Sequence, residues 1–150
     1  MRKKLIIFKV ECNSKIGFGH FKRCITYSSH LVNQNIKIFF LIKKNDIVKK
    51  IIKYYKIKNF FFNDLYSTSI LKKLSKKYEK YQKIIIFDSY KINQKILDKS
   101  KLFFEKIGYL DDYGLNFNSD FVINYSIEKN IYKYNAKKIF LGKKCNICKK

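Results

Sequence analysis

Residues 5–23, LIIFKVECNSKIGFGHFKR, decide the fold because they place a glycine-rich turn between a strand and a helix. An apolar run of strand length opens the segment, and a helical pattern begins near His20. Glycine lets the backbone approach a ligand closely, and the first N–H groups of a helix have no partner inside it. Such a turn is suited to binding an anion. We therefore predict that Gly17 and Gly19 contact a ligand and that His20 lies at the mouth of the turn.

Strand and helix patterns alternate along the whole chain. Apolar runs predict strands over residues 4–10, 36–42, 57–62, 84–87, 107–110, 121–124 and 139–141. Apolar residues three and four positions apart predict helices over residues 20–33, 46–55, 69–82 and 93–105. Short, continuously apolar strands joined by helices are typical of a parallel sheet covered on both faces. The sequence therefore predicts an α/β fold, a doubly wound parallel sheet.

Polar residues follow the predicted strands at the edge where such sheets bind ligands, the carboxyl ends of the strands. These segments are Glu11–Gly19, Asp88–Tyr90, Asp111–Gly114 and Asn124–Ser126. Several candidate residues also have a purely structural interpretation. His20 can be a core residue or a helix cap, Asp88 can cap the following loop, and the Asp111-Asp112 pair can stabilise a turn.

The chain is strongly basic, but its composition does not indicate a nucleic-acid-binding protein. Its 150 residues suit one domain and carry a formal net charge of +23. Only two of the 34 basic residues are arginines, whereas specific DNA recognition favours arginine, so AT-rich codon usage can explain the many lysines. No apolar run reaches the ~20 residues of a membrane span, and the first apolar run is too short for a signal peptide. We expect a cytoplasmic location without a membrane span.

Two other sites are weakly supported. A dinucleotide-binding fingerprint needs a third glycine where Lys22 stands, and an acidic residue near the end of the second strand, where Lys43 and Lys44 follow Ile42. Cys145-x-x-Cys148 has the spacing of half a zinc site, but no second pair completes it. We therefore expect no metal and no cofactor.

Residues 8–23 resemble the N-terminal signature of the UDP-sugar hydrolase of pseudaminic acid biosynthesis, which the related spore-coat polysaccharide proteins share. Within them, Ile16-Gly17-Phe18-Gly19-His20 with Arg23 is the most specific part. Further segments are similar to landmarks of the same family and follow in the same order: Ile84–Tyr90, Tyr109–Asp112, Ser119–Asn124 and Phe140–Lys149.

This resemblance implies a Rossmann-like N-terminal half of a glycosyltransferase-B fold, as in the lipid-linked muropeptide glycosyltransferases. The family hydrolyses a UDP-linked diacetamido-trideoxy-altrose to UDP and the free sugar without a metal. By resemblance, His20 acts on the attacking water. The residues that would bind substrate are Gly17, Gly19, Arg23, Asp88, Tyr90 and Asp112.

The chain also departs from the family. Lys9, Glu11 and Ser89 stand where the family usually has Arg, Asp and His, and Lys143, Cys145 and Lys149 stand where it has Pro, Tyr and Arg. The family's second domain carries most of the uridine and diphosphate contacts. We expect residues 1–150 to be the sugar-side domain alone, with a separately encoded polypeptide as a possible source of the second. Whether the chain is an enzyme stays open, the alternatives being a non-catalytic nucleotide-sugar-binding or partner-docking module and an inactive truncated remnant.

Overall fold

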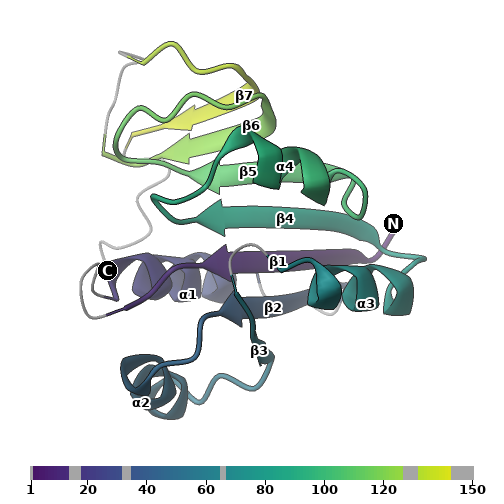
Figure 1. Cartoon of the computed structure of the whole chain (residues 1–150), viewed down its shortest axis with the longest axis vertical. Helices are drawn as coiled ribbons and strands as arrows, with labels where there is room; N and C mark the ends of the chain where they lie inside the picture. Colours follow the sequence, from purple (N-terminus) through teal and green to yellow (C-terminus); the bar gives the residue numbers. More distant parts are fainter. Residues whose placement is uncertain (1, 14–17, 32–34, 65–66, 127–131, 143–150) are drawn as a thin grey trace.

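The fold is a single seven-stranded sheet with four helices (Figure 1). The structure, a computed structural model, describes residues 2–13, 18–31, 35–64, 67–126 and 132–142. The strands are β1 (Lys4–Val10), β2 (Ile36–Ile42), β3 (Phe60–Phe62), β4 (Gln82–Asp88), β5 (Lys106–Leu110), β6 (Ser119–Asn124) and β7 (Ala136–Leu141). The helices are α1 (Gly19–Leu31), α2 (Asp46–Tyr54), α3 (Ser69–Lys77) and α4 (Gln94–Ser100).

All adjacent strand pairs are parallel, and the strand order is β3-β2-β1-β4-β5-β6-β7. The first six strands follow the order of Rossmann-like doubly wound sheets. β1 pairs with β2 on one side and with β4 on the other, and Val10 lies opposite Asp88 at the carboxyl ends. The predicted α/β class and parallel sheet are therefore confirmed.

The central strand β1 supplies both cores because its side chains alternate between the two faces of the sheet. Leu5 and Ile7 join a buried cluster that contains residues of α3 and α4. Ile6 and Phe8 join a second cluster that contains residues of α1 and α2. Two helices therefore lie on each face of the sheet, as Figure 1 shows.

Several predicted elements have other bounds in the structure, and three of them are shorter than predicted by three residues or more. The expected strand 57–62 begins only at Phe60, because the N–H of Ile57 bonds to the carbonyl of Ile52 and still belongs to the end of α2. The expected helix 69–82 ends at Lys77, because Gln82 already bonds to the carbonyl of Lys3 in the sheet. The expected helix 93–105 ends at Ser100 and continues as a turn.

For one part of the sheet, the described residues do not supply the expected helices. Within the described ranges, no helix connects β5 to β6 or β6 to β7. On the α3–α4 side, loop residues such as Leu115 and Phe117 pack against the core in place of helices. On the other face, α1 and α2 lie near β1 and β2 in Figure 1 and do not extend over β5 to β7. Among the described residues, no helix is long and apolar enough to cross a membrane.

Gly108, in the middle of β5, makes room for a neighbouring aromatic ring. A Cβ atom added at Gly108 would lie 2.2 Å from the nearest atom of the Phe121 ring on β6. We expect Gly108→Ala to lower the free energy of unfolding by about 1–3 kcal/mol, because the ring must leave its packed position. Urea unfolding measures the effect. Gly19→Ala is the control, since no atom lies within 4 Å of its added Cβ, and equal losses in the two variants would contradict this explanation.

Lys9 on β1 is a buried amine, 2% exposed, whose Nζ donates to the carbonyl of Ser67 at 2.8 Å. Burial lowers the pKa of Lys9 from 10.5 to about 8, against the opposing charge of Asp64. Between pH 8 and 10.5 the unfolded chain therefore binds the proton more strongly, so this residue makes the fold more stable as the pH rises.

Removing the Lys9 amine is expected to change how stability depends on pH. From pH 7 to pH 10, the unchanged protein should gain about 2–3 kcal/mol of unfolding free energy relative to Lys9→Met. Urea unfolding of both proteins at the two pH values checks this, because the shared titrations cancel in the difference. Parallel stability curves would mean that Lys9 titrates as a solvated lysine.

Candidate functional site

The candidate site lies at the carboxyl ends of β1 and β4, where the chain reverses its winding direction. After β1 the chain runs through α1 to β2 on one side, and after β4 it runs through α4 to β5 on the other side. Ligands of open α/β sheets bind in the crevice that such a reversal opens. The strand and helix order therefore places α1, with His20 and Arg23, beside Asp88 at the end of β4.

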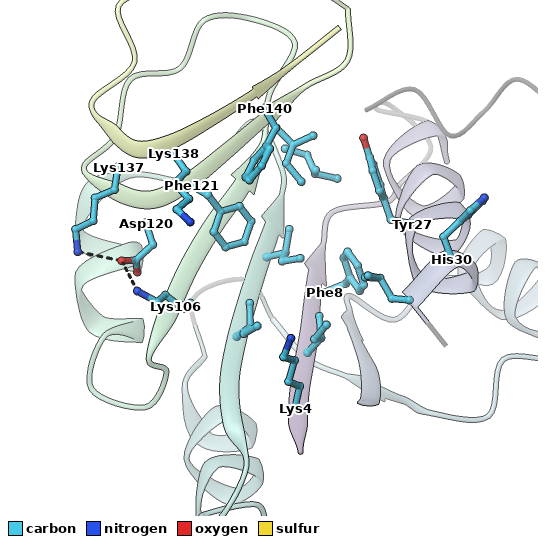
Figure 2. Close-up of a pocket in the computed structure, with 16 residues that line it drawn as sticks. Lys4, Phe8, Tyr27, His30, Lys106, Asp120, Phe121, Lys137, Lys138 and Phe140 are labelled. Carbon is cyan, nitrogen blue, oxygen red and sulfur yellow. Dashed lines mark hydrogen bonds and ion pairs between the residues drawn. The ribbon is translucent and has the colours of Figure 1, made fainter. Parts of the chain in front are cut away.

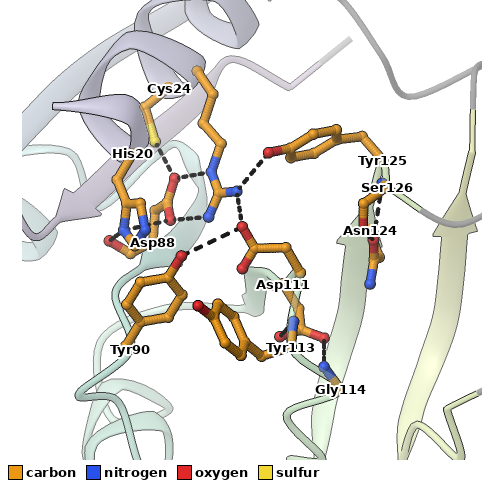
Figure 3. A network of polar contacts seen from close by, with 12 residues as sticks. His20, Cys24, Asp88, Tyr90, Asp111, Tyr113, Gly114, Asn124, Tyr125 and Ser126 are labelled. Carbon is orange, nitrogen blue, oxygen red and sulfur yellow. Dashed lines mark hydrogen bonds and ion pairs between the residues drawn. The ribbon is translucent and has the colours of Figure 1, made fainter. Parts of the chain in front are cut away.

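Arg23 is the centre of a buried polar network, whose partners Asp88 and Tyr125 are labelled in Figure 3. Its Nε donates to Oδ2 of Asp88 at 2.6 Å, and its Nη2 donates to Oδ1 at 2.5 Å. Its Nη1 donates to Oδ2 of Asp112 at 3.0 Å and to the hydroxyl of Tyr125 at 3.3 Å. Two-pronged arginine–carboxylate pairs are among the strongest hydrogen-bonded contacts. Arg23 therefore ties α1 to the segments that follow β4, β5 and β6.

The opposite charges of Arg23 and its two carboxylate partners stabilise one another because the groups are in direct contact. Burial raises the pKa of the fully buried Asp88 carboxyl, and the hydrogen bonds and charge of Arg23 oppose that rise. Burial also disfavours the guanidinium cation, but contacts with Asp88 and Asp112 outweigh this and raise the pKa of Arg23. Arg23 therefore stays protonated, and the pair is an ionic contact inside the protein.

His20 faces this network through one ring nitrogen and leaves the other without a partner. Its Nδ1 lies 3.1 Å from Oδ1 of Asp88 and 3.3 Å from the backbone oxygen of the same residue. Both oxygens accept hydrogen bonds, so we assign the proton of the neutral ring to Nδ1. Nε2 is buried and has no hydrogen-bond partner within the described part of the chain. With the proton on Nδ1, the lone pair of the ring is on Nε2, which is a proton acceptor.

Cys24 also contacts Asp88, and its thiol lies 3.3 Å from Oδ2. Burial and the neighbouring carboxylate raise the pKa of the Cys24 thiol well above its usual value. The thiol therefore stays protonated and donates to the carboxylate. Because a nucleophilic cysteine needs a lowered pKa, Cys24 supports the position of Asp88 and is not a candidate nucleophile.

The two adjacent aspartates after β5 have different roles. Asp111 accepts hydrogen bonds from the N–H groups of Tyr113 and Gly114 and from the hydroxyl of Tyr134. It therefore stabilises the turn, as the structural interpretation predicts. Asp112 turns to Arg23 instead, and its Oδ1 is buried with no hydrogen-bond partner in the described ranges.

Two tyrosines form the exposed side of the site. The rings of His20 and Tyr90 meet edge to face at 4.5 Å between centroids, and Tyr90 meets Tyr113 in the same way at 4.7 Å. Tyr90 is 40% exposed and Tyr113 is 68% exposed. Figure 3 shows Tyr90 next to His20 and Tyr113 next to Tyr90. Large aromatic side chains exposed beside a polar site provide a flat surface on which a ring-shaped ligand can stack.

The structure brings most of the predicted site residues together. His20, Arg23, Asp88, Tyr90 and Asp112 share one network, and Gly19 begins the helix that carries His20. Arg23 and Asp88 are buried and bonded to each other, so their direct contact with substrate stays a prediction.

The structure does not describe the predicted Gly17, and the other histidine and the C-terminal cysteine pair are not predicted to belong to the site. Gly17 and the Cys145–Cys148 pair lie outside the described residues. His30 is exposed, and its Nδ1 lies 2.9 Å from the carbonyl of Thr26 on its own helix. In the described ranges, no group of three or more His, Cys, Asp or Glu side chains is arranged to hold a metal ion.

Sequence reasoning missed Tyr113 and Tyr125. Each follows a polar residue at the end of a predicted strand, in segments that the strand-end rule had already marked. The rule therefore marks the two segments that contain these tyrosines, although it does not single out the tyrosines themselves.

Comparison with known proteins does not assign a family or a function to this site. No protein-family model matches the chain, and no curated protein matches its sequence. The family resemblance therefore rests on the quoted motif residues alone, and the activity it implies is a proposal.

Proposed function

We propose that this domain is the sugar-side half of a nucleotide-sugar hydrolase site that releases UDP from a UDP-linked diacetamido-trideoxy sugar, as in pseudaminic acid biosynthesis. One observation carries the proposal. Nδ1 of His20 contacts Asp88, while Nε2 of the same ring is buried and has no hydrogen-bond partner among the described residues, at the strand ends where doubly wound sheets bind ligands. A histidine held in this way is poised to act as a general base.

In the proposed reaction, Nε2 of His20 takes a proton from a water molecule. The water oxygen forms a bond to the anomeric carbon of the sugar, and the bond from that carbon to the phosphate oxygen breaks. The electron pair of that bond leaves with UDP. The Asp88 carboxylate stabilises the imidazolium that forms, and Arg23 holds the carboxylate in place, since both its oxygens accept from the guanidinium.

The remaining parts of the site have supporting roles in this proposal. The N–H groups at the start of α1 would bind diphosphate charge, and Tyr90 and Tyr113 would stack against the sugar ring. Most contacts to uridine would come from a second domain of the glycosyltransferase-B kind, including one supplied by a separate polypeptide.

The proposal is tested by incubating the purified chain with the UDP-linked diacetamido-trideoxy-altrose and measuring UDP by chromatography. UDP-N-acetylglucosamine is the control substrate, and His20→Gln protein purified in the same way controls for contaminating hydrolases. We expect UDP release from the first substrate only. Calorimetric binding without UDP release would instead identify a non-catalytic binding module. The absence of both binding and release would overturn the proposal for the chain on its own.

A further inference from the structure

The uncovered part of the sheet forms an apolar groove beside α1 (Figure 2). The groove has a volume of about 610 Å³. Five adjacent strands, β1 and β4 to β7, supply its floor, through Ile6, Phe8, Ile84, Ile86, Leu110, Phe121, Ile123 and Phe140. Phe140 is 44% exposed, and Phe121 is only partly buried although its ring packs over Gly108. This surface is separate from the His20 site, which lies at the carboxyl ends of the strands.

A parallel sheet is normally covered on both faces, so an apolar uncovered face indicates a missing layer. The opposite face of β5 to β7 has its layer, made by loop residues such as Leu115, Phe117 and Tyr134. On the groove side, α1 forms one wall through Tyr27 and Leu31, and the described ranges place no helix over β5 to β7. The exposed apolar floor therefore belongs to one side of the sheet only.

The charges around the groove limit what can cover it. Lys4, Lys106, Lys137 and Lys138 line it together with a single carboxylate, Asp120. Asp120 already forms ion pairs with Lys106 and Lys137, at 3.6 and 3.0 Å. A second copy of this chain would bring a like-charged rim against these lysines, at a net charge of +23 per chain. An occupant with acidic residues beside its apolar surface is favoured instead.

We propose that this groove binds an amphipathic helix of a separate polypeptide, with acidic residues on both sides of its apolar stripe. A helix satisfies its own backbone hydrogen bonds and can therefore lie on an apolar floor, whereas an extended peptide would leave backbone groups unpaired there. The strands of the floor have five to seven residues and span about 17–23 Å. A helix of about 11–15 residues matches that length.

Three synthetic 15-residue peptides test this docking site by fluorescence anisotropy. The first has leucines at helical spacing flanked by glutamates, the second has the same composition with the stripe rearranged, and the third has lysines in place of the glutamates. We expect the first peptide to bind at least tenfold more tightly than either of the others. Equal binding of the first two peptides would mean that only general charge attraction holds them, and it would overturn the proposal.

Matched protein variants locate the binding surface. Phe140→Asp should weaken binding of the first peptide at least tenfold, and the rim variant Lys138→Glu should weaken it in a salt-dependent manner. Leu102→Asp is the control, because Leu102 is also a large exposed apolar residue, 77% exposed, and does not line the groove. Unchanged binding in Phe140→Asp would overturn the proposal, as would a homodimer in sedimentation that this substitution dissociates.

Discussion

Replacing His20 by glutamine is expected to lower the rate of UDP release by about 10²–10⁴-fold at saturating substrate. Glutamine is close in size and can still donate a hydrogen bond to Asp88, so the surrounding network has no reason to collapse. Its amide cannot accept a proton from water as the imidazole lone pair on Nε2 can. The loss should therefore appear in kcat, with little change in KM, because this contact matters most in the transition state.

The chain offers a matched control for this substitution. His30→Gln makes the same chemical change on the same helix, at an exposed histidine whose hydrogen-bond partners among the described residues, Thr26 and Ser29, are both on that helix. It should leave UDP release unchanged. Equal rates in the unchanged protein and His20→Gln would remove His20 from the mechanism, and equal losses in both variants would point to a general effect of altering α1.

The sequence predicts the sheet well because its strands are short apolar runs bounded by charged residues. The bounds of β1 and β2 match the prediction, because each is a mostly apolar segment with polar residues before and after it. Helix ends are less predictable, because they depend on where the next strand pairs. The apolar pattern of α3 runs on past Lys77, but pairing of Gln82 with the first strand takes the chain out of the helix.

The position of the site was also predictable, whereas its internal contacts were not. The rule that ligands bind at carboxyl ends of parallel strands marks Asp88 and Asp112 from sequence alone. The same rule does not show that Arg23 reaches Asp88 across 65 positions and buries it. Nor does the sequence show that Asp88 contacts Nδ1 of His20, because side-chain partners distant in sequence depend on the packed positions of α1 and β4.

Replacing Asp88 by alanine is expected to destabilise the fold by about 3–5 kcal/mol. The substitution leaves the buried Arg23 cation without its two-pronged partner, and it removes the contact to His20 as well. For a chain of this size, that loss corresponds to a melting temperature lower by roughly 6–20 °C. Calorimetry or circular dichroism measures it. Asp98→Ala is the control, because the Asp98 ion pair with Lys101 is exposed, and its melting temperature should stay close to that of the unchanged protein.

A double variant separates the role of this pair in stability from its role in the proposed reaction. Replacing Arg23 by methionine and Asp88 by leucine removes both charges and fills their space, which is often neutral or stabilising for buried ion pairs. Asp112 loses its contact with Arg23, but it is partly exposed and water can replace the donor. The melting temperature should therefore recover most of the loss seen in Asp88→Ala, while UDP release stays low because His20 has lost the carboxylate that orients it. Recovery of activity together with stability would mean that Asp88 serves the fold alone.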